Sequence, residues 1–244
     1  MLLKDRVLLV THVRRFAGHG VTRLALAEGA KVIAHDESFA AAAKRKAFDA
    51  EFPGARAIAA QEPSKIVEGA LKLASRIDAL VSNDAYPALR APLTEARMED
   101  FRAALETMVV KPFELAQKVV PVMRRQKAGR IVFVSSAAPL RGIANYSMYV
   151  SARAGTLGLV QSLAKELGRD NITVNAVGSN YVENPDYFPP ALLANAEAMR
   201  KMTAQIPMGR LGKPEELASA VCFLCSDGAG FVTGHTLAHA GGWA

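Results

Sequence analysis

A steady alternation of short apolar runs with longer segments of helical spacing constrains this fold more than any other sequence feature. Six runs are too short for helices and rich in Val, Ile and Leu, as buried strands are: Val7–Val10, Lys31–Ala34, Ala79–Ser82, Arg130–Ser135, Thr173–Val177 and Thr236–Ala240. The predicted helices are Gly18–Glu28, Ser38–Glu51, Pro63–Ser75, Thr94–Arg125, Tyr146–Gly168 and Pro214–Ser226. Such alternation predicts an α/β fold of three layers, a doubly wound parallel sheet covered by helices on both faces.

One stretch departs from this regularity. Residues 178–190 contain three prolines and three aromatic residues without a clear period. In parallel sheets, ligands are held by loops at the carboxyl ends of strands, and this stretch follows a predicted strand. We therefore expect a single Rossmann-like domain over residues 1–244 with a ligand loop at about 178–190.

Composition excludes several classes of protein. Half of the 244 residues are apolar and 22% are charged, which excludes a disordered chain. No apolar run reaches the ~18–20 residues needed to cross a bilayer, and the charged N-terminal segment does not suit a secretory signal, so we expect a cytoplasmic protein without a membrane partner. Cys222 and Cys225 lie one helical turn apart. A buried apolar helix explains this spacing better than a redox pair.

The positive charge does not predict nucleic-acid binding. The formal net charge is +7, but Arg14-Arg15, Lys44-Arg45-Lys46 and Arg124-Arg125 fall in separate segments. No aromatic residues alternate with them to form a stacking platform for bases. We expect no nucleic-acid partner and a mild attraction for small anions.

The segment after the first predicted strand runs Thr-His-Val-Arg-Arg-Phe-Ala-Gly (residues 11–18). It resembles the short-chain dehydrogenase/reductase pattern T-G-x-x-x-G-x-G, but His12 and Phe16 replace two of the glycines and only Gly18 remains. Phe16 occupies the position where the backbone would approach the nicotinamide end of a cofactor; alternatively, its ring points into the core. Either arrangement disfavours tight nucleotide binding. Without the glycines, we expect Asp36 to be a solvated loop residue.

A second set of residues carries candidate chemistry. Ser136 follows the predicted strand Arg130–Ser135, and Tyr149 and Arg153 are spaced to share one helical face. They resemble the catalytic Ser and Tyr-x-x-x-Lys of the same superfamily, with arginine in place of lysine. A free phenol, with a pKa of ~10, is a poor base at neutral pH, and a nearby guanidinium stabilises its phenolate form. The alternative is a helix surface on which Arg153 pairs with an acid.

These departures together resemble the halohydrin dehalogenases, and the A-type members most. The matching blocks are residues 10–12, 16–18, 81–84, 149–154, 178–181, 186–189 and 207–212. Ser179 stands where the family commonly has proline. The resemblance implies conversion of vicinal haloalcohols to epoxides with release of halide and a proton. The reaction is reversible with anionic nucleophiles such as azide, cyanide or nitrite, and requires no NAD(P).

The resemblance also assigns roles to residues. Tyr149 would be the general base, Arg153 would stabilise its phenolate, and Ser136 would hold the substrate oxygen. Asp84 would bond to Arg153 or the tyrosine region and help to carry the proton out, although Asn83-Asp84 also suits a simple loop turn. The expected halide site is Phe16, Ser179, Asn180, Tyr181 and Val182. The expected substrate pocket is Tyr86, Pro139, Leu140, Ile143, Tyr187 and Phe188.

Further expectations concern assembly and metals. By resemblance, a homotetramer would form through the predicted helices Thr94–Arg125 and Tyr146–Gly168. Trp243 is a candidate for packing at a subunit contact. We interpret His235 and His239 as structural and expect no metal.

Two other functions remain open at this point. One is an oxidoreductase of the same fold that binds NAD(P) weakly through its altered loop. The other is a non-catalytic sensor or scaffold that lost its cofactor, although such a protein has no chemical need for the spacing of Ser136 and Tyr149.

Overall fold

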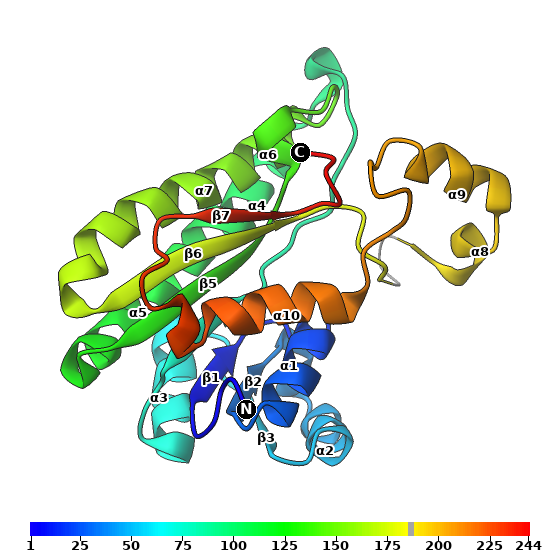
Figure 1. The fold of residues 1–244 in the computed structure, drawn as a ribbon. Coiled ribbons are helices and arrows are strands. Elements are labelled where there is room, and N and C mark those ends of the chain that lie inside the picture. Colours follow the sequence, from blue (N-terminus) through cyan, green and yellow to red (C-terminus); the bar gives the residue numbers. More distant parts are fainter. Residues whose placement is uncertain (185–187) are drawn as a thin grey trace.

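A parallel sheet forms the centre of the molecule (Figure 1). The computed structural model describes residues 1–184 and 188–244. Within them, seven strands lie in the order β3-β2-β1-β4-β5-β6-β7. Their bounds are β1 Val7–Val10, β2 Lys31–His35, β3 Ala55–Ile58, β4 Ala79–Ser82, β5 Gly129–Ser136, β6 Ile172–Ser179 and β7 Thr236–His239. The predicted doubly wound α/β sheet is confirmed.

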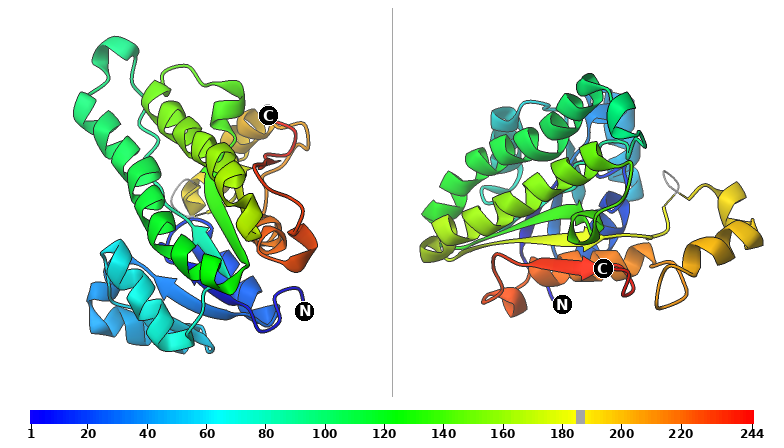
Figure 2. Two further views of the ribbon diagram at one scale, coloured as in Figure 1. Left: turned by 90° about the vertical axis from the view of Figure 1, so that its left-hand side faces the viewer. Right: turned by 90° about the horizontal axis from the view of Figure 1, so that it is seen from above.

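Helices cover both faces of this sheet. The helices of the described residues are α1 Gly18–Ala27, α2 Ala42–Glu51, α3 Pro63–Ala74, α4 Met98–Leu105, α5 Lys111–Gln126, α6 Ala138–Arg141, α7 Ser147–Leu167, α8 Pro190–Leu193, α9 Ala196–Thr203 and α10 Pro214–Leu224. In the right-hand view of Figure 2, α5 and α7 lie on one side of the sheet and α10 on the other, while α8 and α9 project from the body. Among the described residues, no helix is both long and apolar enough to cross a membrane.

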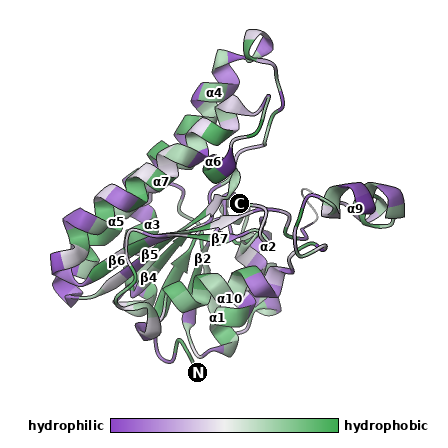
Figure 3. Ribbon diagram, turned by 45° about the horizontal axis from the view of Figure 1, so that its top comes forward, coloured by the Kyte–Doolittle hydropathy of each residue, from purple (hydrophilic) through white to green (hydrophobic). Residues whose placement is uncertain are grey.

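Side chains that alternate along each strand build the two cores. In β1, Leu8 and Val10 pack with α1 and α10, whereas Val7 and Leu9 pack with α3, α5 and α7. Successive strand residues point to opposite faces, so a strand buried on both faces is apolar throughout. Figure 3 shows the resulting apolar strands between helices with polar outer faces.

β3 and the irregular course of one long helix differ from the sequence-based prediction. β3, at the edge of the sheet, has the sequence Ala-Arg-Ala-Ile with Arg56 exposed, so it lacks a continuous apolar run. The predicted helix Thr94–Arg125 begins at Met98 and contains a π-helical turn, η3 Glu106–Val110. Pro112 has no N–H to donate to the carbonyl of Met108, which instead accepts a hydrogen bond from Thr156 Oγ1 at 2.8 Å.

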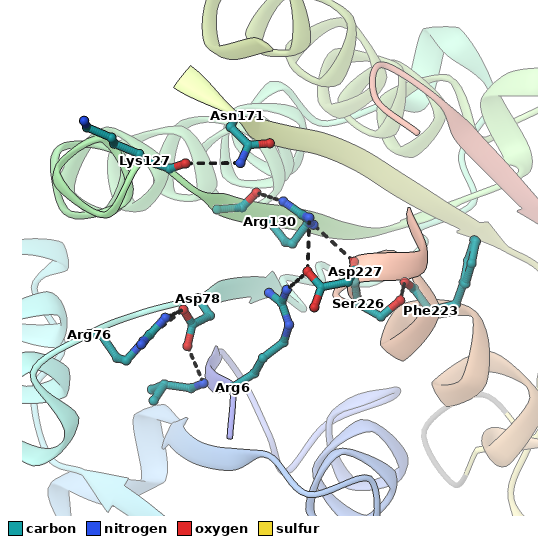
Figure 4. Close-up of polar contacts among 11 residues, drawn as sticks. Arg6, Arg76, Asp78, Lys127, Arg130, Asn171, Phe223, Ser226 and Asp227 are labelled. Carbon is teal, nitrogen blue, oxygen red and sulfur yellow. Dashed lines mark hydrogen bonds and ion pairs between the residues drawn. The ribbon is translucent and has the colours of Figure 1, made fainter. Parts of the chain in front are cut away.

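The amino ends of the central strands are held by charged groups (Figure 4). The Asp78 carboxylate accepts from the backbone N–H of Val7 at 2.8 Å and pairs with Arg76 at 2.5 Å. Arg6 and the buried Arg130 both pair with Asp227. These contacts lie at the edge of the sheet opposite the carboxyl ends of the strands.

The carboxyl ends are therefore available for a site. The chain reverses its direction of progression across the sheet between β1 and β4, which are neighbours in space. Loops that leave such a pair diverge and open a crevice above the sheet. The segment after β1 and the segment after β4 border this crevice.

Gly18, the surviving glycine of the first motif, is required by packing. A Cβ built at Gly18 would lie 2.5 Å from the backbone Cα of Val13, which cannot yield as a flexible side chain would. We expect Gly18→Ala to lower the free energy of unfolding by about 1–3 kcal/mol, as overpacked sites do, in chemical denaturation. The matched control is Gly69→Ala in α3, where the new methyl would lie 3.7 Å from Ile58. In this variant the free energy of unfolding should rise by about 0.5–1 kcal/mol, because alanine favours a helix interior over glycine. Equal changes in the two variants would contradict this account.

Candidate active site

The three predicted catalytic residues come together at the carboxyl end of β5. Ser136 is the last residue of this strand, and its Oγ accepts from the N–H of Ala138 at 3.1 Å. Tyr149 and Arg153 project from the same face of α7, where Arg153 Nε donates to the Tyr149 hydroxyl at 3.3 Å. The guanidinium carbon also lies 5.4 Å from the centre of the Tyr149 ring. Ser136, Tyr149 and Arg153 line one cavity of about 290 Å³.

Arg153 is buried and held by backbone carbonyls. Its Nη1 donates to the carbonyls of Asp84 and Val134, each at 3.1 Å, and the residue is only 4% exposed. β4 ends opposite Phe133, so the Arg153 side chain bridges the end of β5 and the segment after β4. Among the described residues, no carboxylate forms an ion pair with Arg153. The alternative of a surface arginine paired with an acid is therefore wrong.

An unpaired buried cation has a direct chemical consequence. Burial of a charge is costly unless hydrogen bonds and an opposite charge compensate for it. The two carbonyls compensate Arg153 only with dipoles, so a negative charge on the Tyr149 oxygen would complete the neutralisation. The Tyr149 oxygen therefore lies against a buried cation that no carboxylate of the described residues neutralises.

The cavity contains most of the predicted halide and substrate residues. Of those, it is lined by Phe16, Ile143, Ser179, Asn180, Tyr181, Val182 and Phe188. Three predicted pocket residues lie elsewhere. Tyr86 donates its hydroxyl to Asp100 at 3.3 Å beside a separate small cavity, Leu140 is 48% exposed, and Pro139 does not line the site. Tyr187 lies outside the described residues.

Tyr86 and Leu140 were misplaced for a simple reason. Both follow strand ends that do border the site, but the loop after β4 presents the small residues Ala85 and Ala88 to the cavity instead. The short helix α6 turns Leu140 towards solvent. Sequence proximity to a strand end does not fix the direction of a side chain in a loop.

The segment after β6 forms the opposite wall. Ser179 Oγ donates to the carbonyl of Ser135 at 3.2 Å, which ties this segment to the end of β5. Tyr181 has a left-handed backbone conformation (φ 53°), and its carbonyl accepts from Gly212 N–H. Among the described residues, the N–H groups of Tyr181 and Val182 donate to no backbone acceptor. Two free N–H groups beside a cavity are typical of an anion-binding nest.

Trp243 packs within the chain rather than at its surface. It is 7% exposed, and its ring meets that of Tyr181 edge-on with centroids 5.9 Å apart. The Arg141 guanidinium lies 5.0 Å from the Trp243 ring centre. Within the chain, Trp243 therefore packs behind Tyr181 and supports the wall of the cavity. Its predicted place at a subunit contact stays a prediction.

The first motif keeps the backbone of a glycine turn without its glycines. His12 and Phe16 both have positive φ values, 46° and 39°, in the left-handed region that costs non-glycine residues energy. The buried Asn83 side chain donates to the carbonyls of His12 and Arg15 at 3.0 and 2.9 Å. Its own N–H donates to Thr11 Oγ1 at 2.9 Å. Asn83 thereby holds the turn in its strained form.

The Asp84 carboxylate does not reach Arg153, contrary to one form of the expectation. Only its backbone carbonyl contacts Arg153, while the carboxylate accepts from Ser82 Oγ and pairs with His12 Nε2 at 3.0 Å. Burial lowers the pKa of His12, but the hydrogen bond and charge of Asp84 outweigh it and raise that pKa above 6.5. Burial alone would raise the pKa of Asp84, and His12 reverses this effect and lowers it. Asn83-Asp84 is therefore more than a loop turn.

Asp36 is buried, so the prediction of a solvated loop residue is wrong. It is 5% exposed, and its carboxylate caps the 3₁₀ turn η1 Glu37–Ala40 by accepting from Ser38 N–H at 3.0 Å. The carboxylate also accepts from Arg14 N–H at 3.3 Å, in the segment after β1. Burial opposes ionisation of Asp36, but these hydrogen bonds from Ser38 and Arg14 lower its pKa. Its carboxylate is thus engaged by the chain itself.

A second cavity of about 310 Å³ is lined by His12 and shares no lining residue with the catalytic cavity. It is lined by Thr11, His12, His35, Glu37, Gln61, Glu62, Pro63, Ile66, Asp84, Glu106, Lys111, Glu114 and Leu115. His35 is buried, and burial, with the charge of His12, lowers its pKa to about 4. Because His35 is neutral and the carboxylates outnumber Lys111, the charged side chains that line this cavity are mainly acidic.

Other sequence-based expectations concern metals and cysteines. Among the described residues, no group of His, Cys, Asp and Glu side chains could hold a metal ion. Cys222 and Cys225 are free and buried, as expected for a buried helix, and burial raises the pKa of the Cys222 thiol to about 12.

The sequence analysis missed further lining residues. Ala85, Ala88, Ser135, Ala138, Tyr146 and Asn184 also line the catalytic cavity. Tyr146 immediately precedes α7 with a non-helical backbone, so helical spacing from Tyr149 could not have placed it in the cavity. The alanines carry no chemical signal.

Comparisons with known proteins agree with this geometry. A family model described as enoyl-(acyl carrier protein) reductase matches residues 17–244. The 3-oxoacyl-[acyl-carrier-protein] reductase of Thermotoga maritima is 34% identical over 256 residues, which span 99% of each chain. A solved structure described as a dehalogenation enzyme is 72% identical, with 100% of both chains covered and a TM-score of 0.98. A solved halohydrin dehalogenase bound to ethyl (2S)-oxiran-2-ylacetate is 35% identical, covers 97% of this chain and 96% of its own, and has a TM-score of 0.93.

The brace on the strained turn is testable. Asn83→Ala removes two hydrogen bonds from a buried amide, so we expect the free energy of unfolding to fall by about 1–3 kcal/mol in urea denaturation. Gln61→Ala, which shortens an exposed amide with only long contacts, should change it by less than about 0.5 kcal/mol. An Asn83 variant as stable as the Gln61 variant would show that the turn needs no brace.

Proposed function

The chain belongs to the halohydrin dehalogenases of the short-chain dehydrogenase/reductase superfamily, and from this membership we propose how its residues convert vicinal haloalcohols to epoxides. The observation that carries the proposal is the placement of Ser136, Tyr149 and Arg153 on one cavity whose adjoining turn is filled by Phe16.

Tyr149 acts as the general base. As a phenolate stabilised by the buried Arg153, it takes the proton from the substrate hydroxyl while Ser136 Oγ donates to the same oxygen. The alkoxide attacks the neighbouring carbon in line with the carbon–halogen bond. The C–O bond forms as the C–halogen bond breaks, and the bonding pair leaves with the halide. Because the displacement is intramolecular, its barrier is lowered mainly by the orientation of the substrate in the cavity.

The departing halide binds at the cavity wall formed by the segment after β6. The free N–H groups of Tyr181 and Val182 supply positive dipoles, and the ring edges of Phe16 and Tyr181 add partial positive charge. Burial raises the pKa of Tyr181, which keeps its phenol neutral beside an anion. Asn180 donates its N–H to His239 and Ser179 holds the segment to β5, so the wall is rigid. In the reverse direction the same wall would admit small anionic nucleophiles such as azide, cyanide or nitrite.

The residues do not fit a nicotinamide cofactor, so no step is assigned to one. Phe16 occupies the wall of the catalytic cavity at the turn where the pattern has glycine. Beyond it, the second cavity carries Glu37, Glu62, Glu106 and Glu114 against Lys111, which disfavours the phosphates of a dinucleotide. We propose that the reaction needs no cofactor.

The substrate and partners follow from the same site. A cavity of about 290 Å³ suits a small halohydrin or epoxide together with a halide ion. Exposed apolar side chains on α4, η3 and α5, namely Met98, Val110 and Phe113, support the homotetramer predicted by resemblance. A cytoplasmic location remains a prediction of the sequence.

Loss of the base should abolish the reaction. We expect Tyr149→Phe to reduce halide release from 1,3-dichloro-2-propanol by at least about 10²-fold, the usual contribution of a general base, in a halide and proton release assay. Ser136→Ala should also reduce the rate, while bromide binding is retained in both variants. Unchanged release by Tyr149→Phe would overturn the assigned base.

Cofactor independence has its own measurement. Halide release should be the same with and without NAD(P)H, and NAD(P)H should not raise the thermal unfolding midpoint. Protection against unfolding, combined with no halide release, would favour the oxidoreductase.

A further inference from the structure

We propose that His12 is a positioning residue for the halide wall, the part of the catalytic cavity formed by Phe16, Tyr181 and Val182. The ion pair of His12 with Asp84 holds the turn of residues 11–16, and with it Phe16, against the catalytic cavity. The inference rests on the proposed function, because it assumes that Phe16 faces the departing halide. It concerns a residue outside the catalytic cavity, since His12 lines the second one.

The backbone of the turn explains why the ion pair between His12 and Asp84 is needed. His12 and Phe16 carry left-handed conformations that cost non-glycine residues energy and persist only where surrounding contacts enforce them. Arg15 N–H donates to the His12 carbonyl at 3.0 Å, so His12 and the residue before Phe16 are linked directly. A displacement of His12 is therefore transmitted to Phe16 within one turn.

Asp84, the partner of His12 in this ion pair, belongs to the segment after β4 that also holds Arg153. Asp84 accepts from Arg153 Nη1 through its carbonyl and from His12 Nε2 through its carboxylate, at 3.1 and 3.0 Å. One residue thereby sets the position of the base's partner and of the halide wall relative to each other. A buried two-sided contact of this kind links two parts of a site more firmly than separate surface bonds do.

Charge explains why a histidine is used. The Asp84 side chain is buried, and His12 is the one cation paired with it among the described residues. The neighbouring His35, whose ring lies 5.4 Å from that of His12, is neutral at physiological pH because its pKa is about 4. Loss of the proton from His12 would leave the Asp84 charge uncompensated in the interior, which is costly.

Other charged groups face His12 from every neighbouring element. They are Asp36 and Glu37 after β2, Glu62 before α3, Glu106 in η3, and Lys111 and Glu114 in α5. Asp36 and Glu37 favour the protonated form of His12, as Asp84 does. The raised pKa means that the ion pair is complete below pH 6.5 and is lost as the pH rises through the raised value. Halide affinity should therefore weaken on the alkaline side.

The test compares bromide binding and turnover in two His12 variants. His12→Gly relieves the backbone strain and His12→Asn tolerates the left-handed conformation, so both should fold, and neither carries a charge. Trp243, the only tryptophan in the sequence, touches Tyr181, so its fluorescence reports on bromide at the halide wall. His19→Asn, on a histidine half-exposed at the surface of α1, is the matched control.

We expect both His12 variants to bind bromide about tenfold more weakly, within the range usual for coupled sites, with no further weakening as the pH rises. The unmodified protein and His19→Asn should lose affinity with rising pH. A fall in turnover with unchanged bromide affinity would overturn the proposal and assign His12 to proton transfer. If the unmodified protein neither binds bromide nor releases halide, the proposed function fails; if it does both and the His12 variants match it, only this inference fails.

Discussion

The hydrogen bonds of the buried Arg153 guanidinium are the interaction on which the rest of the site depends. They join α7 to the carbonyls of Val134 in β5 and Asp84 after β4, and they fix Tyr149. Lysine could supply charge, but not the planar set of donors that reaches three acceptors at once. The substitution of arginine for lysine at this position is therefore a structural change as much as an electrostatic one.

The parallel sheet and the gathering of Ser136, Tyr149 and Arg153 at one cavity could be predicted because each leaves a local signal. Buried strands are continuous apolar runs, and Tyr149 and Arg153 share a helical face by spacing alone. β3 escaped prediction because an edge strand needs no such run. The π-helical turn escaped prediction because the free carbonyl of Met108 is satisfied by Thr156 Oγ1 from α7, a contact distant in sequence.

The position of Asp84 shows a different limit of sequence reasoning. A carboxylate next to a strand end could be assigned to the site, but its partner depends on which neighbouring loop presents a donor. His12 presents one only because the first turn keeps a left-handed backbone at that residue. Such a conformation is not predictable for histidine, since the sequence rule associates it with glycine. The burial of Asp36 was unpredictable for a related reason, because one of its hydrogen bonds comes from Arg14 N–H in the same turn.

The retained backbone and the replaced side chains together explain how one fold supports different chemistry. The chain is 34% identical to a 3-oxoacyl-[acyl-carrier-protein] reductase, and it keeps the turn after β1 in a glycine-like conformation. With side chains at His12 and Phe16, however, the crevice above the sheet is divided into a catalytic cavity and an acid-rimmed one. Under the proposed function, a small halohydrin and a halide ion need only the catalytic cavity. The side chains of His12 and Phe16 thus occupy the space above the sheet, while β5 and α7 present Ser136 and Tyr149 at its carboxyl edge.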